Sequence, residues 1–216
     1  MYCPVQFKEE RLPVLHELMA RHPLATLVTL TPQGLEATHL PLLHDAGAGP
    51  FGTLRGHMAR ANPQWRQMSE GVRALAIFHG PQHYISPSWY PSRLEHGRVV
   101  PTWNYVVVHA QGPVRVIPDK DWLRRNVTEL TAAQEAGFAN PWRVEDAPEA
   151  FIDGQANAIV GIEMTIETLE GKWKASQNRP EADRVGVIAG LRALGTPESE
   201  RMAEVVRVAN GLSPRA

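Results

Sequence analysis

Apolar residues in the first half of the chain occur mainly in short, β-branched runs. Residues 24–30 (LATLVTL) form such a run, which ends at the turn sequence TPQG, and residues 35–45 supply a second run, so a hairpin is predicted. Residues 53–59 and 72–80 predict two further strands, and residues 82–90 predict a continuation after a turn.

Helical spacing of apolar residues appears in residues 8–21, where Pro13 fits only the first turns, and again in residues 119–136, which begin at the N-cap candidate Asp119. A brief helix is predicted after Asn62, an N-cap candidate followed by proline.

Residues 158–177 predict one last strand with a bend near Gly171, followed by two short helices, the second of which begins at Thr196 and Pro197. Sequential strands with short turns favour a mainly β, α+β fold, in which a small antiparallel barrel carries peripheral helices. Without an internal repeat or a low-complexity linker, residues 1–216 are interpreted as a single domain.

Composition narrows the function classes. The chain has 216 residues, a formal net charge of −1 and one cysteine, so no internal disulfide is expected. No apolar run is long enough for a membrane helix and no leader sequence is present, so a cytoplasmic location is expected. Basic residues are dispersed, and direct DNA binding is therefore not evident from the charge.

Two segments carry more polar and aromatic groups than packing requires. Residues 55–65 (RGHMARANPQW) place cationic side chains beside a helix start, which suits a phosphate, although a solvated corner would look the same. Residues 80–90 (GPQHYISPSWY) combine aromatic rings with serines and could cover a flat heterocycle, or could be a packed corner.

Two later segments also have two interpretations, ligand binding or an ordinary structural role. Trp103 and Asn104 must point to opposite faces of a strand, so one face could pack while the other binds a ligand or a second subunit. The alternative is a core tryptophan beside a polar solvent face. Lys172 and Lys174 share a strand face, and they could bind an anion or be solvated lysines on an edge strand.

Several chemistries lack their sequence signatures. The histidines show neither H-x-H nor H-E-x-x-H spacing, so no metal site is predicted. Neither a P-loop nor a G-x-S-x-G elbow is present. Residues 47–52 (GAGPFG) match G-x-G-x-x-G, but they connect two predicted strands and do not open a helix, so they do not indicate a Rossmann nucleotide site. No catalytic acid or base can be assigned from the residues.

Five motifs in order carry a family resemblance: MYCPVQF, GHMARANPQW, GPQHYISPSWY, VPTWNYVVVHAQG and LEGKWKASQNR. They resemble the PaiB-type family of FMN-binding negative transcriptional regulators, over nearly the whole chain from Tyr2 to about Leu194. The resemblance implies a flavin-binding split β-barrel that forms a homodimer, with FMN at the subunit interface.

The resemblance gives the polar and aromatic segments a common ligand. FMN has an anionic phosphate, a polar ribityl chain and a flat ring, and each requires a different side-chain chemistry. The FMN-binding candidates are the cations His57, Arg60, Lys172 and Lys174, the hydrogen-bonding residues Asn62, Ser86, Asn104, Gln177 and Asn178, and the planar residues Trp89, Tyr90 and Trp103. The phosphate is expected near Arg60, Lys172 and Lys174.

The sequence leaves three functions open. The first is an FMN-binding regulator with flavin redox activity, such as that of a flavin reductase. The second is a regulator that acts by protein contact without flavin turnover. The third is a haem-binding split barrel.

Overall fold

The computed structural model describes residues 1–68 and 71–213. The chain forms two compact units. The terminal unit comprises Met1–Leu15, His79–Val108 and the chain from Glu170 onward, and the barrel unit comprises His16–Phe78 and His109–Leu169. Strands β5 (Arg73–Ile85) and β6 (Thr102–Ile117) contribute residues to both units. The single domain over residues 1–216 stays a prediction.

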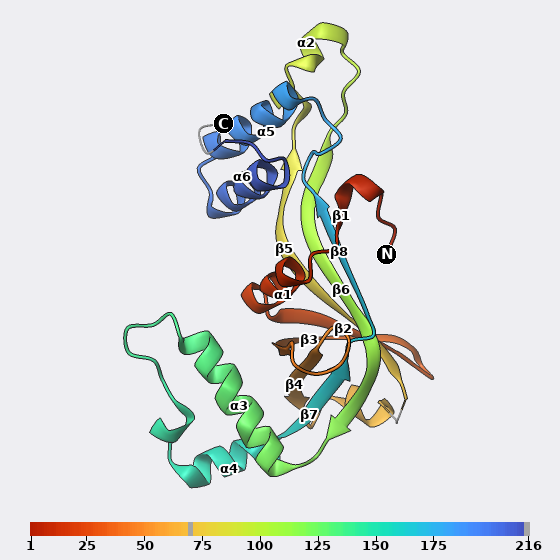
Figure 1. Cartoon of the computed structure of the whole chain (residues 1–216). Coiled ribbons are helices and arrows are strands. Elements are labelled where there is room, and N and C mark those ends of the chain that lie inside the picture. Colours follow the sequence, from red (N-terminus) through yellow and green to blue (C-terminus); the bar gives the residue numbers. More distant parts are fainter. Residues whose placement is uncertain (69–70, 214–216) are drawn as a thin grey trace. The chain divides into compact units, whose positions relative to one another are not determined.

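Six antiparallel strands close the barrel, as the sequence predicts for a mainly β fold (Figure 1). Besides β5 and β6, these are β2 (Leu24–Thr31), β3 (Gly34–Asp45), β4 (Thr53–Ala59) and β7 (Ile159–Thr165). They pair in the order β6-β5-β2-β3-β4-β7, and β7 pairs back with β6 from Val114 opposite Met164 to Ile117 opposite Gly161. Closure leaves no free edge among these six strands.

The predicted hairpin is confirmed in β2 and β3. Thr31 pairs with Gly34 across the turn, where Gly34 has a φ of 122° that glycine adopts without steric cost. Along β2 every second side chain is buried, including Ala25 and Leu27, because alternate residues of a strand face the core. The alternating pattern therefore sets the register of the barrel wall.

Two helices pack against β4 and β7 within the barrel unit: α3 (Lys120–Glu135) and α4 (Glu149–Asn157) (Figure 1). Asp119 caps α3 as predicted, since its Oδ1 accepts a hydrogen bond of 2.6 Å from the backbone N of Trp122. Trp122 lies over Gly161, where a Cβ atom would come within 2.5 Å of its ring.

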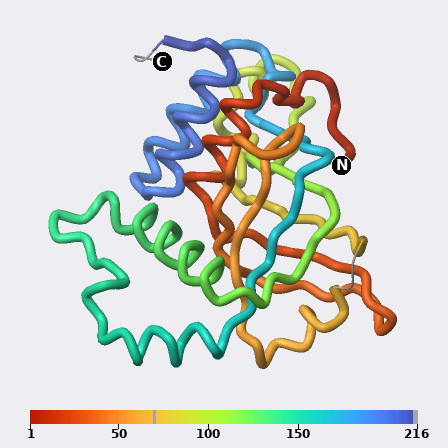
Figure 2. Tube along the Cα trace, turned by 60° about the horizontal axis from the view of Figure 1, so that its bottom comes forward, coloured from red at the N-terminus to blue at the C-terminus, as the bar shows by residue number. Residues whose placement is uncertain are grey.

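The terminal unit contains the short strand β1 (Lys8–Glu9), which pairs with β8 (Thr168–Lys174), and the short helix α2 (Ser92–His96). Helices α5 (Glu181–Ala193) and α6 (Pro197–Ala209) lie against each other (Figures 1 and 2), as the two predicted C-terminal helices. The cap at Thr196 is confirmed.

A buried apolar cluster forms between these two helices and the chain that follows β5. Tyr90, Ile188 and Met202 are all buried in it. The Trp89 ring lies directly on Gly190, where a Cβ atom would come within 2.3 Å of the indole, and Gly186 would meet the Trp89 carbonyl oxygen at 2.1 Å. Close packing here depends on two positions without side chains.

Three element boundaries differ from the prediction. The last strand is interrupted after Thr165 and resumes at Thr168, well before the bend expected near Gly171. The first helix, α1 (Leu12–Arg21), starts late because Lys8 and Glu9 pair with β8. Strand β5 continues through residues 80–81, where a turn was expected, because sheet pairing overrides the local signal of glycine and proline. None of the described helices combines the length and apolar character needed to cross a membrane.

Candidate functional site

Three cations of the terminal unit gather around the end of β8 and the turn that follows it. Lys172 and Lys174 belong to β8, and Arg179 closes the turn. We call Lys172, Lys174 and Arg179 the cation cluster. Among the ion pairs of residues 1–68 and 71–213, none includes a member of this cluster. The cluster therefore carries positive charge that these residues leave without a salt bridge.

Lys172 is the most deeply placed member and is only 8% exposed. Its Nζ donates a hydrogen bond of 3.1 Å to the backbone oxygen of Tyr2 and lies 5.2 Å from the ring centroid of Tyr105. A carbonyl and an aromatic face compensate the loss of water only partly, because burying an ammonium group without a counter-ion is costly. An anionic ligand would complete its environment.

Lys174 is held beside Lys172 by the start of β6. Its Nζ donates a hydrogen bond of 2.5 Å to Oγ1 of Thr102 and lies 6.0 Å from the Tyr105 ring centroid. Burial lowers the pKa of the Lys174 ammonium below its ordinary value of 10.5; Tyr105 raises this pKa, whereas Lys172 and Arg179 lower it. Like charges at close range are stabilised when an anion joins them.

Arg179 stacks on an aromatic ring. Its guanidinium carbon lies 4.7 Å from the ring centroid of Tyr90. Burial raises the pKa of the Tyr90 phenol above 10.0, an effect that the nearby charge of Arg179 opposes. Tyr90 itself is 1% exposed and belongs to the core between α5 and α6, so its ring orients Arg179 and does not present a free face.

The turn after β8 has a strained backbone. Ser176 has a φ of 66°, the only positive φ of a non-glycine residue in the part of the chain that the structure describes. The buried Asn104 amide fixes it, donating a hydrogen bond of 2.8 Å to the Ser176 hydroxyl. Gln177 braces the same turn by accepting from the backbone N of Ala175 at 2.7 Å and donating to the Trp173 oxygen at 2.6 Å. Such strain occurs most often at functional sites.

The remaining candidates of the terminal unit fall into two groups. Trp103 is 54% exposed and meets Tyr84 edge to face, with ring centroids 6.2 Å apart, and Asn178 is exposed in the turn. Ser86 and Trp89 have local roles: the Ser86 hydroxyl accepts from the backbone N of Ser88 at 3.2 Å, and Trp89 packs on α5. Planar surface is thus available at Trp103, while Trp89 is engaged in packing.

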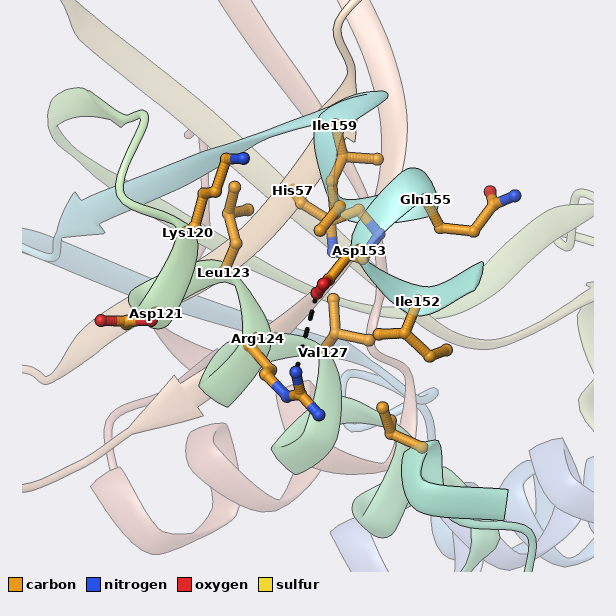
Figure 3. A pocket seen from close by; sticks show the side chains of 12 residues that line it. His57, Lys120, Asp121, Leu123, Arg124, Val127, Ile152, Asp153, Gln155 and Ile159 are labelled. Atoms are coloured by element: carbon orange, nitrogen blue, oxygen red, sulfur yellow. Dashed lines mark ion pairs between the residues drawn. The ribbon is translucent and has the colours of Figure 1, made fainter. Parts of the chain in front are cut away.

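Two of the three candidates of the barrel unit form local hydrogen bonds, and the third lines a pocket. Asn62 caps its short helix, Pro63–Gln67, as predicted, by accepting from the backbone N of Gln64 at 2.9 Å. Arg60 bridges the end of α4 and the start of β7, because its Nε and Nη2 donate to the backbone oxygens of Asn157 and Ile159 at 2.9 and 2.8 Å. His57 lines a pocket beside α3 and α4 (Figure 3). The phosphate site shared by Arg60, Lys172 and Lys174 stays a prediction.

Five residues that complete the surroundings of the cation cluster are absent from the predicted FMN-binding set: Tyr2, Thr102, Tyr105, Ser176 and Arg179. Tyr2 is distant in sequence and reaches Lys172 through the pairing of β1 with β8. The strain at Ser176 has no sequence signal, since serine rarely adopts a left-handed backbone. Thr102 and Tyr105 stand in the TWNY stretch, where their mixed polarity was a usable signal.

The donor set fits the phosphate end of FMN. Two ammonium groups and one guanidinium supply charge-assisted hydrogen bonds, and the Thr102 hydroxyl lies among them. A bound flavin would supply the redox chemistry of its ring, while these side chains bind and orient the phosphate end. Within the described residues, no group of three His, Cys, Asp or Glu side chains is arranged to hold a metal ion.

Comparison with known proteins places these observations in a family. A family model described as "Putative FMN-binding domain" matches residues 1–168. The Bacillus subtilis protein named "Protease synthase and sporulation protein PAI 2" is 34% identical over 207 residues, which cover 95% of this chain and 96% of that protein. An uncharacterised protein of Emericella nidulans is also 34% identical, over 242 residues and 96% of each chain.

Solved structures support the fold alone. The FAD and haem binding protein from Mycobacterium smegmatis superposes with a TM-score of 0.57 at 18% identity, covering 77% of this chain and 73% of that one. The flavocytochrome Anf3 from Azotobacter vinelandii gives a TM-score of 0.55 at 11% identity, covering 83% and 75%. The barrel is thus a split β-barrel of the kind found in flavin-binding proteins. The family match and the similarity to the Bacillus protein agree with the sequence motifs, and this chain belongs to the PaiB-type family of FMN-binding proteins.

Proposed function

We propose that this protein is an FMN-binding regulator, in which the cation cluster holds the FMN phosphate and regulation proceeds through contacts with other proteins. The observation that carries the proposal is the cluster itself: three cations, one of them 8% exposed, without a salt bridge among the described residues. A phosphate of nearly two negative charges would compensate them.

The regulatory part of the proposal rests on the family. The name of the Bacillus subtilis relative links that protein to protease synthase and sporulation, and the motifs resemble those of negative transcriptional regulators. A formal net charge of −1 favours protein contact over direct DNA binding, because duplex affinity depends on a concentrated basic surface.

FMN and riboflavin provide the direct test, since they differ only in the phosphate. Apo-protein is titrated with each ligand while flavin fluorescence is followed. We expect FMN to bind at least about a hundredfold more tightly than riboflavin, because each charge-assisted hydrogen bond contributes about 1.5–3 kcal/mol. Equal affinities would remove phosphate recognition from the proposal.

The absorption spectrum of the purified protein separates the other interpretations. A flavin spectrum supports the proposal, whereas a Soret band without flavin absorption would replace it with haem binding. Oxidation of NADH by the FMN-loaded protein would add a flavin-reductase activity to the regulatory role. Tight, sequence-specific DNA binding at physiological salt would contradict regulation by protein contact.

We also propose a homodimer that buries the exposed apolar residues between the end of β5 and the start of β6. Tyr84, Leu94, Val100 and Trp103 are 42%, 81%, 64% and 54% exposed, and aromatic residues are enriched in buried interface cores. Sedimentation should show a dimer at micromolar concentration, and Trp103→Glu should shift it to monomer. Phe138→Glu, at a residue of the barrel unit that is 65% exposed, is the matched control and should leave the dimer intact. A monomeric wild-type protein would contradict this proposal.

A further inference from the structure

A pocket of about 370 Å³ lies in the barrel unit, beside the outer side of the barrel wall (Figure 3). Its walls come from β4 through His57, from β7 through Ile159, and from facing sides of α3 and α4. Every lining residue belongs to the barrel unit, whereas the cation cluster belongs to the terminal unit. A volume of this size falls within the range of small-molecule sites.

The interior of this pocket is mainly apolar. Leu123 and Val127 of α3 face Ile152 and Ala156 of α4 across it, as Figure 3 shows for the three labelled residues of this set. Such a lining releases free energy when an apolar ligand body displaces water from it. The pocket therefore favours a ligand with a largely apolar body.

The charged groups around this apolar lining are balanced. Lys120 and Arg124 are the cations, and Asp121 and Asp153 are the carboxylates. Arg124 is already shared between acids, with its Nη1 3.6 Å from Oε1 of Glu149 and 3.7 Å from Oδ1 of Asp153. These carboxylates would repel a dianionic phosphate, so the wall favours a neutral ligand.

Polar atoms without partners lie on the barrel side of α3. Among the described residues, Nδ1 of His57, Nε of Arg55 and both amide atoms of Asn126 are buried and have no hydrogen-bond partner. Arg55 and His57 are alternate residues of β4 and share a face, and Arg55 Nη2 reaches Glu129 of α3 at 2.8 Å.

Asn126 belongs to the same region. Trp122 of α3 covers Gly161, which pairs with His57 in the sheet. Glu129 of α3 forms an ion pair with Arg55. The helix therefore lies beside His57 near residue 122 and beside Arg55 at residue 129. Asn126 lies midway along this stretch and is 1% exposed. Buried polar groups in native proteins are normally hydrogen-bonded. Of these three residues only His57 lines the pocket, so a ligand there could supply a partner to the His57 ring.

We propose that the pocket between β4, β7, α3 and α4 binds a small neutral molecule with an apolar body and one polar group, which hydrogen-bonds to the His57 imidazole. Neutral alcohols, amides and nitrogen heterocycles share this chemistry. Burial lowers the pKa of His57 below its ordinary value of 6.5, so the ring is neutral at pH 7 and can both donate and accept a hydrogen bond. This site is separate from FMN binding by the cation cluster and does not depend on it.

The test uses 5-fluoroindole and its N-methyl derivative as probes, observed by fluorine NMR with protein saturated in FMN. We expect 5-fluoroindole to bind with a dissociation constant of about 1 mM or below, and the N-methyl derivative to bind about three- to tenfold more weakly, since it lacks the donor. In His57→Phe, which keeps the shape of the ring, the two probes should bind equally.

Filling the pocket should abolish binding. Val127→Trp and, from the opposite wall, Ala156→Phe should each weaken 5-fluoroindole by at least about tenfold. Leu35→Trp adds the same indole at a residue that is 75% exposed in the barrel unit, and should leave binding unchanged. Unchanged flavin absorption and unfolding temperature confirm that a variant is folded.

Three outcomes would overturn the proposal. The first is the absence of fluorine line broadening at about 1 mM 5-fluoroindole in the wild-type protein. The second is equal broadening in the wild-type protein and in a folded variant with a filled pocket. Displacement of FMN by the probe would show that the two ligands compete, and would also contradict a separate site.

Discussion

The cation cluster of the terminal unit and the pocket of the barrel unit both contain polar groups that the described chain leaves unsatisfied, but of different kinds. At the cluster the deficit is charge: Lys172, Lys174 and Arg179 form no ion pair among the described residues. At the pocket the charges are balanced, and the deficit is a hydrogen bond near His57. The kind of deficit indicates the kind of ligand, an anion for the first region and a neutral molecule for the second.

The largest effect is expected when the unpaired positive charge of the cation cluster is removed. Lys172→Met combined with Lys174→Met keeps the aliphatic stems and should weaken FMN binding by about a hundredfold or more, because two charge-assisted contacts are lost. Riboflavin affinity should change little, so the preference for FMN disappears. Fluorescence titration of both ligands measures this.

The matched control removes two cations that already have acidic partners. Arg11 pairs with Glu9 and Arg201 with Glu198, and both arginines are well exposed. The double variant Arg11→Met, Arg201→Met should keep the preference for FMN. If it lowers FMN affinity as much as the lysine variant, general charge and not the cluster explains binding.

The second expected effect concerns the strained turn beside the cluster. Ser176→Ala should lower the free energy of unfolding by about 1–3 kcal/mol, because the buried Asn104 amide loses its acceptor while the positive φ of 66° remains. Ser176→Gly loses the same hydrogen bond but relieves the left-handed strain, and should recover about 1 kcal/mol. Urea denaturation compares the two, and a glycine variant less stable than the alanine variant would refute strain at this position.

The third expected effect tests whether Arg60 stabilises the barrel unit or contacts the FMN phosphate. Arg60→Ala removes one hydrogen bond to the last residue of α4 and one to the first residue of β7, and should cost about 1 kcal/mol, the usual scale for a cation at a helix C-terminus. Amide hydrogen exchange should accelerate in α4 and stay unchanged in α5. Arg66→Ala, at an arginine stacked on Trp65, is the control. A large loss of FMN affinity in Arg60→Ala would instead support the phosphate contact that the sequence predicts.

The smallest expected effect is the pH dependence of the pocket. Burial lowers the pKa of His57 below 6.5 in the folded protein, so the unfolded chain binds the proton first as the pH falls. Stability should therefore decrease as the pH falls below about 6.5 and continue to decrease until the folded-state pKa is reached. His57→Phe should flatten this part of the profile of unfolding temperature against pH. Burial also lowers the pKa of His44, so a residual slope should remain and should decrease on adding His44→Phe.

Local signals predicted much of the fold. The alternation in residues 24–45 gave the hairpin, and Asp119, Asn62 and Thr196 marked the starts of their helices, because caps and strand faces depend on neighbouring residues. Long-range pairing decided what the local signals could not. Strand β5 continues through a Gly-Pro sequence, and α4 was not predicted, since its stability depends on contacts with α3, β7 and Arg60.

The candidate site shows the same limit. The spacing of Lys172 and Lys174 put them correctly on one strand face, and both lie near Tyr105. The absence of ion pairs between them and the acidic residues that the structure describes could not be read from sequence, because any of 23 acidic residues could have paired with them. Trp89 and Tyr90 were chosen as planar ligand surface, whereas burial against α5 and α6 is visible only once those helices are in place.

The contact of Trp89 with Gly186 and Gly190 has a genetic consequence. A methyl group at either glycine would overlap Trp89, so a single-base change to alanine should yield a protein that is functional at low temperature and lost at high temperature. Such conditional alleles would lie outside both the cation cluster and the pocket. They would permit the protein to be depleted in living cells within one experiment, and the processes that fail first would show where the protein is needed.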